Sequence, residues 1–360
     1  MNLLSVAAVS RDATLLAARL AKQIEASGPI SVAEYMRAAN AEYYATRDPL
    51  GVDGDFITAP EISQMFGEMV GLWLTDLWMR VGSPADVNLV ELGPGRGTLM
   101  ADILRTIGNF DFAPPVHFVE TSEALRAKQL ASVPRAIFHN GIDTLPKSGP
   151  LLVIANEFFD ALPVQQFVAT HAGWRERVVV RDRAAKFMAM PGTKSVDHLV
   201  PTEVRNGPND SIYESSPETA GIFFELAQRL AMQGGVMLVV DYGYTVPGLG
   251  STLQALKAHA HADPFENPGE HDLTAHVNFL ELAGLARVQN LRVSGAADQG
   301  HWLRALGIDA RAATLAAASP DRAEEIAAMR NRLVEPAQMG SLFKVLAVRP
   351  ESWPEPEGFG

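Results

Sequence analysis

Three glycines at alternate positions follow a short apolar run in the stretch VELGPGRGT. An apolar strand, a glycine-rich turn and a helix form a cradle for a cofactor, because backbone N–H groups approach a ligand closely where no side chain intervenes. The glycines are Gly93, Gly95 and Gly97, and Thr98 stands where the dinucleotide fingerprint has its third glycine. Glu91, two residues before the first glycine, is poorly placed beside a pyrophosphate and suits a ligand with a positive ammonium and sulfonium. The turn therefore favours S-adenosylmethionine, and a NAD(P)-dependent oxidoreductase stays as the alternative.

Two further acids follow the next apolar runs. Glu120 ends VHFVE, 23 residues after Gly97, where a carboxylate can accept hydrogen bonds from both ribose hydroxyls of either kind of cofactor. Asp143, in HNGIDTLP, lies where a polar group often contacts adenine, and a role as a turn or capping residue is equally open. Both acids fit an adenosine-containing ligand without telling the two cofactors apart.

A second group of polar residues, Asn156, Glu157 and Asp160, follows the apolar run LLVIA. Ligands of open α/β sheets bind beyond the carboxyl ends of the strands. Two carboxylates three residues apart can bind a guanidinium through charge-assisted hydrogen bonds, and one of them can help to remove a proton. The alternative is that both acids cap a helix while Phe158 and Phe159 belong to the core.

The elements that must position these residues alternate between short apolar runs and helical patterns, which is typical of parallel βαβ units. We expect strands at 87–92, 116–120, 136–139, 151–155 and 236–241, and helices at 98–108, 121–131 and 217–233. The end of the chain shows two more candidate strands, 286–293 and 342–348, on either side of a helical pair at 299–335. These patterns predict a mixed α/β fold.

The segments outside this alternation have other sequence patterns. Residues 11–40 have helical spacing with a break at Gly28-Pro29, residues 44–60 are expected to form a loop, and a long amphipathic helix is expected from Pro60 to Gly82. Residues 164–206 alternate like antiparallel strands and are interpreted as an insertion. We therefore expect an N-terminal helical region at 1–83, a main domain at 84–350 with an insertion at about 164–216, and a tail at 351–360.

Composition excludes several classes of protein. The 360 residues include no cysteine, which removes disulfides, thiolate catalysis and cysteine-based zinc sites. A net charge of −12 disfavours a nucleic-acid partner. No uninterrupted apolar run reaches the length of a transmembrane helix, and the start of the chain has no secretory pattern, so we expect a cytoplasmic protein. The spacing of His271, Asp272 and His276 matches no helical zinc motif, so we expect no metal.

Six stretches, taken in order along the chain, resemble the MidA family of S-adenosylmethionine-dependent methyltransferases, which includes a mitochondrial complex I assembly factor. They are GDFITAPEISQMFGEMVG (54–71), VELGPGRGTLMADILR (90–105), NEFFDALPVQQF (156–167), VVDYGY (239–244), GEHDLTAHVNF (269–279) and MGSLFKVLAV (339–348). The resemblance covers about residues 15–348, and the first and third stretches are far more specific than the glycine turn. Ala59, where the family usually has Ser, and Gln165, where it often has His, are mild departures.

The resemblance implies a class I methyltransferase (Rossmann-like) fold: a mostly parallel seven-stranded sheet with helices on both faces, an N-terminal helical extension and a β-rich insertion. It implies methylation of a protein arginine, reported for the family as symmetric dimethylation of a complex I peripheral-arm subunit in support of assembly. The cofactor would be held by Glu91, Gly93, Gly95, Gly97, Glu120, Asp143 and Thr58, with the loop 54–58 over it. Asn156, Glu157 and Asp160 would face the substrate, with Glu157 preferred for positioning and polarising the guanidinium and Asp160 as second choice.

The expected partner is therefore a protein that contains the target arginine, and the assembly state is left open to a homodimer. A bacterial member would act in the cytoplasm and a eukaryotic one in the mitochondrial matrix. A non-catalytic assembly chaperone that keeps an adenosylmethionine pocket remains a further alternative.

Overall fold

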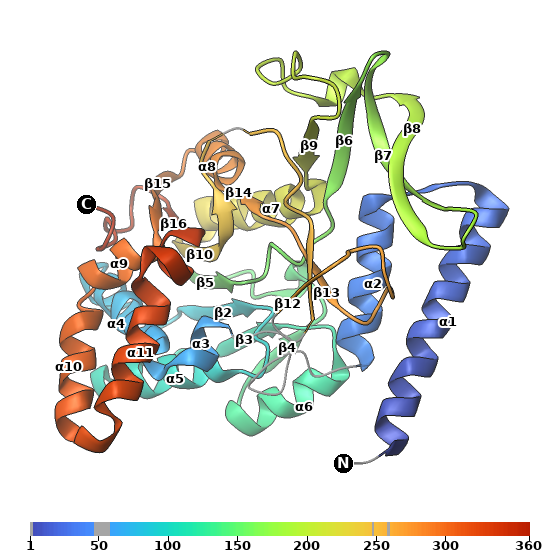
Figure 1. Ribbon diagram of the computed structural model, residues 1–360. Coiled ribbons are helices and arrows are strands. Elements are labelled where there is room, and N and C mark those ends of the chain that lie inside the picture. Colours follow the sequence, from blue (N-terminus) through green and yellow to red (C-terminus); the bar gives the residue numbers. More distant parts are fainter. Residues whose placement is uncertain (1–2, 47–57, 247, 258–259) are drawn as a thin grey trace. The chain divides into compact units, whose positions relative to one another are not determined.

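The computed structural model describes residues 3–46, 58–246, 248–257 and 260–360 (Figure 1). The chain forms two compact units. Unit 1 comprises Met1–Phe56, Asp160–Thr219 and Val246–His276, and unit 2 comprises Ile57–Phe159, Ala220–Thr245 and Val277–Gly360. The loop expected at 44–60 is wrong at both ends, because α2 (Val32–Thr46) runs into its start and α3 (Ala59–Ile62) begins before its end. Residues 47–57, with most of the expected covering loop 54–58, lie outside the described residues. Within the described ranges, no helix has both the length and the apolar character needed to cross a bilayer.

A mixed sheet forms the centre of unit 2, with the strand order β15-β16-β10-β5-β2-β3-β4. The strands are β2 (Asn88–Leu92), β3 (Val116–Val119), β4 (Ile137–His139), β5 (Leu151–Asn156), β10 (Gly235–Tyr244), β15 (Arg292–Asp298) and β16 (Phe343–Arg349). The run β4-β3-β2-β5-β10 is parallel, whereas β16 is antiparallel to both β10 and β15. A short strand, β14 (Val277–Asn278), pairs with β10 as well. Every residue of β2 and β5 is buried, as expected for parallel strands that are covered on both faces.

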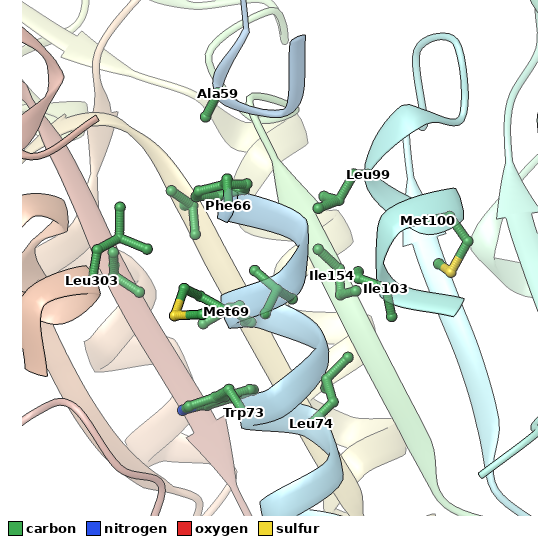
Figure 2. Packing of buried hydrophobic residues seen from close by; sticks show 14 of the residues in the cluster. Ala59, Phe66, Met69, Trp73, Leu74, Leu99, Met100, Ile103, Ile154 and Leu303 are labelled. Carbon is green, nitrogen blue, oxygen red and sulfur yellow. The ribbon is translucent and has the colours of Figure 1, made fainter. Parts of the chain in front are cut away.

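Helices pack against this sheet, and together they form the hydrophobic core of unit 2. They are α3 (Ala59–Ile62), α4 (Gln64–Arg80), α5 (Thr98–Ile107), α6 (Glu123–Ser132), α7 (Pro217–Gln233), α8 (Phe279–Val288), α9 (Gln299–Ala305), α10 (Ile308–Ala318) and α11 (Ala323–Val334). In Figure 2, Met69 lies on the side of α4 that faces Leu303, and Leu99 and Ile103 of α5 line the opposite side. The buried side chains of α4 belong to the core of unit 2. Fully burying one such side chain stabilises the fold by about 1.5–3 kcal/mol.

Most of the expected elements of unit 2 are confirmed, and three expectations are corrected. The strand expected at 286–293 is wrong in its first part, because α8 continues to Val288 and β15 begins only at Arg292. The long helix expected from Pro60 is two helices, because Ser63 has an extended backbone and its side chain accepts a hydrogen bond from the N–H of Met65 to cap α4. The helical pair expected at 299–335 consists of α9, α10 and α11.

Unit 1 joins two N-terminal helices to antiparallel strands. Its elements are α1 (Leu3–Ser27), β1 (Ile30–Ser31), α2 (Val32–Thr46), β6 (Gln165–Thr170), β7 (Gly173–Arg181), β8 (Phe187–Ser195), β9 (Ile212–Ser215), β11 (Gln254–Lys257), β12 (Ala260–Ala262) and β13 (Asp272–Thr274). The sheet order is β1-β7-β6-β9, with β8 also paired to β7, and the antiparallel character expected for the insertion is confirmed. At the start of α2, the Ser31 N–H donates to Glu34 Oε2 at 2.8 Å and the Glu34 N–H donates to Ser31 Oγ at 3.1 Å, which is a capping box.

The two units divide the chain differently from the expected domains. Residues 57–83, expected with the N-terminal region, belong to unit 2, because α4 packs on α5 and on the sheet core. The N-terminal helices instead share unit 1 with the insertion, where Ile30 and Ser31 pair with β7. A two-residue strand carries no periodic signal, so this pairing could not be predicted from the sequence.

The contact between α4 and α5 depends on small residues. A Cβ atom at Gly67 would lie 2.5 Å from Asp102 Cβ, and one at Gly71 would lie 2.9 Å from Thr106 Cβ. Since real Cβ atoms do not approach neighbours this closely, the two helices keep their spacing only with glycine at these positions.

We predict that Gly67→Ala lowers the free energy of unfolding by about 1–3 kcal/mol, because overpacking outweighs the gain in helix propensity. Gly284→Ala is the matched control, since a Cβ at this helical position of α8 meets open space. The control is expected to raise stability by roughly 0.5–1 kcal/mol. Urea denaturation of both variants checks this, and equal shifts of the same sign would contradict it.

Candidate active site

The glycine turn lies between β2 and α5, and its three glycines have left-handed backbone conformations, with φ of +58° at Gly93, +55° at Gly95 and +80° at Gly97. The Gly97 N–H donates to the carbonyl of Pro94 at 2.7 Å, which closes the turn. A Cβ atom at Gly93 would come within 2.8 Å of the ring of Phe158. The turn therefore requires glycine both for its conformation and for the close approach of the neighbouring segment.

Glu91 lies inside β2, between β3 and β5, and is 3% exposed. Its Oε2 has no hydrogen-bond partner among the described residues. Burial raises the pKa of Glu91 to about 8, so the carboxyl group is mostly neutral at pH 7 in the free protein. A buried carboxyl of this kind at the ligand edge of a sheet gains charge readily when a cation arrives beside it.

Glu120 follows β3 and is connected to the glycine turn through Gln129 of α6. Glu120 Oε1 accepts from the Ser122 N–H at 2.7 Å, and its Oε2 accepts from Gln129 Nε2 at 3.1 Å. The same Gln129 amide donates to the carbonyl of Gly95 at 2.7 Å, and its side chain is fully buried. No pattern in the sequence selects Gln129, because a glutamine in a helical segment carries no signal for a hydrogen bond to a residue 34 positions away.

Asp143 is exposed and lies in a single 3-10 turn, Ile142–Thr144, after β4. Arg229 of α7 holds this turn from beneath: its Nη1 donates to the carbonyl of Ile142 at 2.8 Å, and its Nη2 donates to the carbonyl of Pro146. Thr58 precedes α3 in the N-cap position with an extended backbone, and its side chain makes no capping hydrogen bond.

The segment after β5 forms a strained turn next to the glycines. Asn156 is 9% exposed, and Glu157 has a φ of +50°, which is uncommon for a residue other than glycine. Glu157 Oε1 accepts from the Ala59 N–H at 3.0 Å and from Asn156 Nδ2 at 3.1 Å. Glu157 therefore caps α3 at its first residue, Ala59, as expected if the acids of this segment cap a helix. Phe159 is buried, as the same alternative predicts.

Asp241, near the end of β10, holds the strained turn in place. Its Oδ2 accepts from the N–H groups of Phe158 at 3.2 Å and Phe159 at 2.9 Å, and its Oδ1 accepts from the Tyr242 N–H at 2.9 Å. The side chain is fully buried. The two hydrogen bonds to Phe158 and Phe159 fix the turn that carries Glu157, and the third stays within β10.

The third acid of the expected substrate group lies in the other unit. Asp160 belongs to unit 1, is 5% exposed, and has its pKa raised by burial to about 7. The structure thus brings Asn156 and Glu157 together with the glycine turn in unit 2. His271, also in unit 1, has its Nε2 2.7 Å from the carbonyl of Glu266, an arrangement in which this nitrogen donates.

These residues fit an adenosylmethionine-like ligand. An unpaired buried carboxyl at Glu91 suits a cation, a second carboxylate follows the adjacent strand at Glu120, and the left-handed glycines keep side chains out of the space between them. Glu91 does not suit a pyrophosphate, so it does not favour a dinucleotide, whereas Glu120 is compatible with either cofactor.

We predict that Glu91 makes the stability of the free protein fall between about pH 4.5 and pH 8. The unfolded chain loses the proton near the ordinary pKa of 4.5, whereas the folded chain keeps it to about pH 8, so the folded state binds more protons in this range. Relative to the wild type, Glu91→Gln should gain stability across this window by an amount on the order of a few kcal/mol. Urea denaturation between pH 4.5 and 8.5 measures the difference, and parallel profiles would contradict the assignment.

Comparison with known proteins agrees with this geometry. Residues 69–297 match the family described as "Putative S-adenosyl-L-methionine-dependent methyltransferase". The chain is 37% identical to the mitochondrial protein arginine methyltransferase NDUFAF7 homolog of Drosophila melanogaster, over 93% of this chain and 85% of the relative. It is 34% identical to the human mitochondrial protein arginine methyltransferase NDUFAF7, over 91% and 82% of the two chains.

A crystal structure from Burkholderia thailandensis, bound to S-adenosylhomocysteine, superposes with a TM-score of 0.85 at 24% identity and covers 97% of this chain and 95% of its own. It shows the same fold. The extent and identity of the sequence matches show more: this chain belongs to the family of S-adenosyl-L-methionine-dependent methyltransferases that contains the NDUFAF7 proteins.

Proposed function

We propose that this methyltransferase modifies an arginine of a protein substrate, by symmetric dimethylation of a complex I peripheral-arm subunit that supports assembly of the complex. The observation that carries the proposal is the position of the Glu157 carboxylate. Glu157 directly follows β5 and accepts a hydrogen bond from the Ala59 N–H, and the next residue, Phe158, packs against Gly93 of the glycine turn. Carboxylates recognise guanidinium groups through paired, charge-assisted hydrogen bonds. The mitochondrial relatives are named protein arginine methyltransferases, which supports the same acceptor.

On the cofactor side, Glu91 would face the positive part of the ligand and Glu120 its ribose hydroxyls. Gly93, Gly95 and Gly97 would let the ligand approach the backbone. Asp143 would contact the adenine, and Thr58 would contact the cofactor from the end of the loop 54–58. When bound, the cofactor supplies a methyl group on a sulfonium that is already activated for transfer. The protein therefore needs mainly to bind, orient and exclude water.

On the acceptor side, the task is to make one guanidinium nitrogen nucleophilic. A free guanidinium has a pKa above about 12 and its nitrogens are poor nucleophiles while it is fully protonated. Glu157, supported by Asn156, would hold the guanidinium and polarise it. Asp160 is the second candidate, since a carboxyl group whose pKa burial raises to about 7 can accept a proton near neutral pH.

The finer features of the fold are part of the same proposal. We assign the sheet of unit 2, in which β16 is antiparallel to β10, to the class I methyltransferase arrangement with helices on both faces. By analogy with relatives named mitochondrial, the site of action is the matrix in a eukaryote and the cytoplasm in a bacterium, and a homodimer is compatible with the proposal.

We predict that the wild type transfers labelled methyl groups to the cognate complex I subunit, and that Glu157→Gln lowers kcat by about 100-fold or more. The affinity for S-adenosylhomocysteine should stay within about threefold, because the lost charge belongs to the acceptor side. The exposed Glu123→Gln of α6 is the matched control and should keep the wild-type rate.

Mass spectrometry of the labelled subunit identifies the acceptor. Label on arginine, absent when that arginine is replaced by lysine, supports the proposal. Transfer to another residue type, or a Glu157→Gln enzyme with the wild-type rate, would refute it.

A further inference from the structure

We propose that Glu61 and Thr98 form a positioning pair for methyl transfer, which holds the acceptor carboxylate Glu157 in register with the glycine turn through the short helix α3. The proposal rests on the proposed function, in which the turn binds the cofactor and Glu157 the acceptor. It assigns a role to two residues that touch neither part of the reaction in that scheme.

The first link joins α3 to the cofactor side. Thr98 is the first residue of α5, directly after Gly97, and its Oγ1 donates to Glu61 Oε1 at 2.5 Å. Both side chains are half-buried, so this hydrogen bond is partly shielded from water. Thr98 thus replaces the third glycine of the dinucleotide fingerprint with a hydroxyl group that is used as a donor.

The second link joins the same helix to the acceptor side. The Ala59 N–H, at the start of α3, donates to Glu157 Oε1 at 3.0 Å, and Glu61 follows only two residues later. Ala59, Pro60 and Ile62 are all buried, and proline restricts the backbone at the start of the helix. A four-residue helix packed in this way moves as one piece, so a shift of Glu61 is also a shift of Ala59.

A direct contact connects the two sides as well. The nearest ring atom of Phe158 would lie 2.8 Å from a Cβ atom placed on Gly93, and Phe158 follows Glu157 in the turn held by Asp241. The acceptor turn is therefore bounded by the glycine turn on one side and by α3 on the other. Changes in the glycine turn on cofactor binding reach Glu157 directly through Phe158 and indirectly through α3. The Glu61–Thr98 hydrogen bond controls the route through α3.

The kinetic test removes the bond from either end. Thr98→Val and Glu61→Leu should each lower kcat about tenfold, while the dissociation constant of S-adenosylhomocysteine changes less than about threefold. The double variant should be no slower than the slower single variant, since both remove one interaction. Thr98→Ser keeps a hydroxyl donor and Glu61→Gln keeps an oxygen acceptor, so both should retain kcat within about threefold.

Glu68→Gln is the matched control. Glu68 lies on the neighbouring helix α4, is a buried carboxylate, and accepts two hydrogen bonds of 2.8 Å from Arg311. This variant should lose stability and keep kcat. Wild-type kcat in Glu61→Leu, an effect confined to cofactor affinity, or additive losses in the double variant would each overturn the proposal.

Hydrogen exchange gives a test that needs no acceptor. S-adenosylhomocysteine should slow amide exchange in residues 59–62 of the wild type and of Glu68→Gln, and should fail to do so in Thr98→Val. Equal protection in Thr98→Val would overturn the coupling. If the wild type transfers no methyl group to arginine, the proposed function fails, and this exchange experiment still decides whether the pair couples the two sides.

Discussion

The carboxyl group of Glu91, buried between parallel strands, is the constraint from which the rest of the site follows: its Oε2 has no hydrogen-bond partner in the described part of the chain. Glu91 occupies the fourth position of a strand whose five residues are all buried, and burial raises its pKa to about 8. Such a group costs stability unless something compensates it. The chain leaves β2 two residues later through three left-handed glycines, which keep the adjoining space clear of side chains. The strand is thus built to accept a cation at its carboxyl end.

A second buried acid, Asp241, holds the turn after β5 that carries Glu157. Asp241 accepts hydrogen bonds from two N–H groups of the turn after β5, in which Glu157 has a φ of +50°. In this conformation the carboxylate of Glu157 reaches the start of α3, whose third residue bonds to Thr98. In the proposed function Glu91 would bind the cofactor, whereas Asp241 positions the turn after β5 through backbone hydrogen bonds.

The sequence predicted those features that local patterns encode. Continuous apolar runs predicted β2 and β5, since strands covered on both faces have no polar side, and the glycine spacing with Glu91 predicted the cofactor. Asp241, Gln129 and Arg229 could not be found in this way, because each acts on backbone groups distant in sequence; Asp241 lies 82 residues from Phe159. The strand expected at 286–293 is wrong in its first part because Ala286 and Val288, two apolar residues at alternate positions, fit the end of a helix as well as a strand.

The central claim is that Glu91 exchanges its proton for the positive charge of the cofactor, and calorimetry tests it most directly. Binding heats of S-adenosylmethionine at pH 7, without an acceptor substrate, are measured in three buffers of different ionisation enthalpy, for the wild type and for Glu91→Gln. A carboxyl with a pKa of about 8 that becomes charged on binding releases about one proton at this pH, and the variant releases none. A wild-type binding heat independent of the buffer, or the same proton release in Glu91→Gln, would contradict the account.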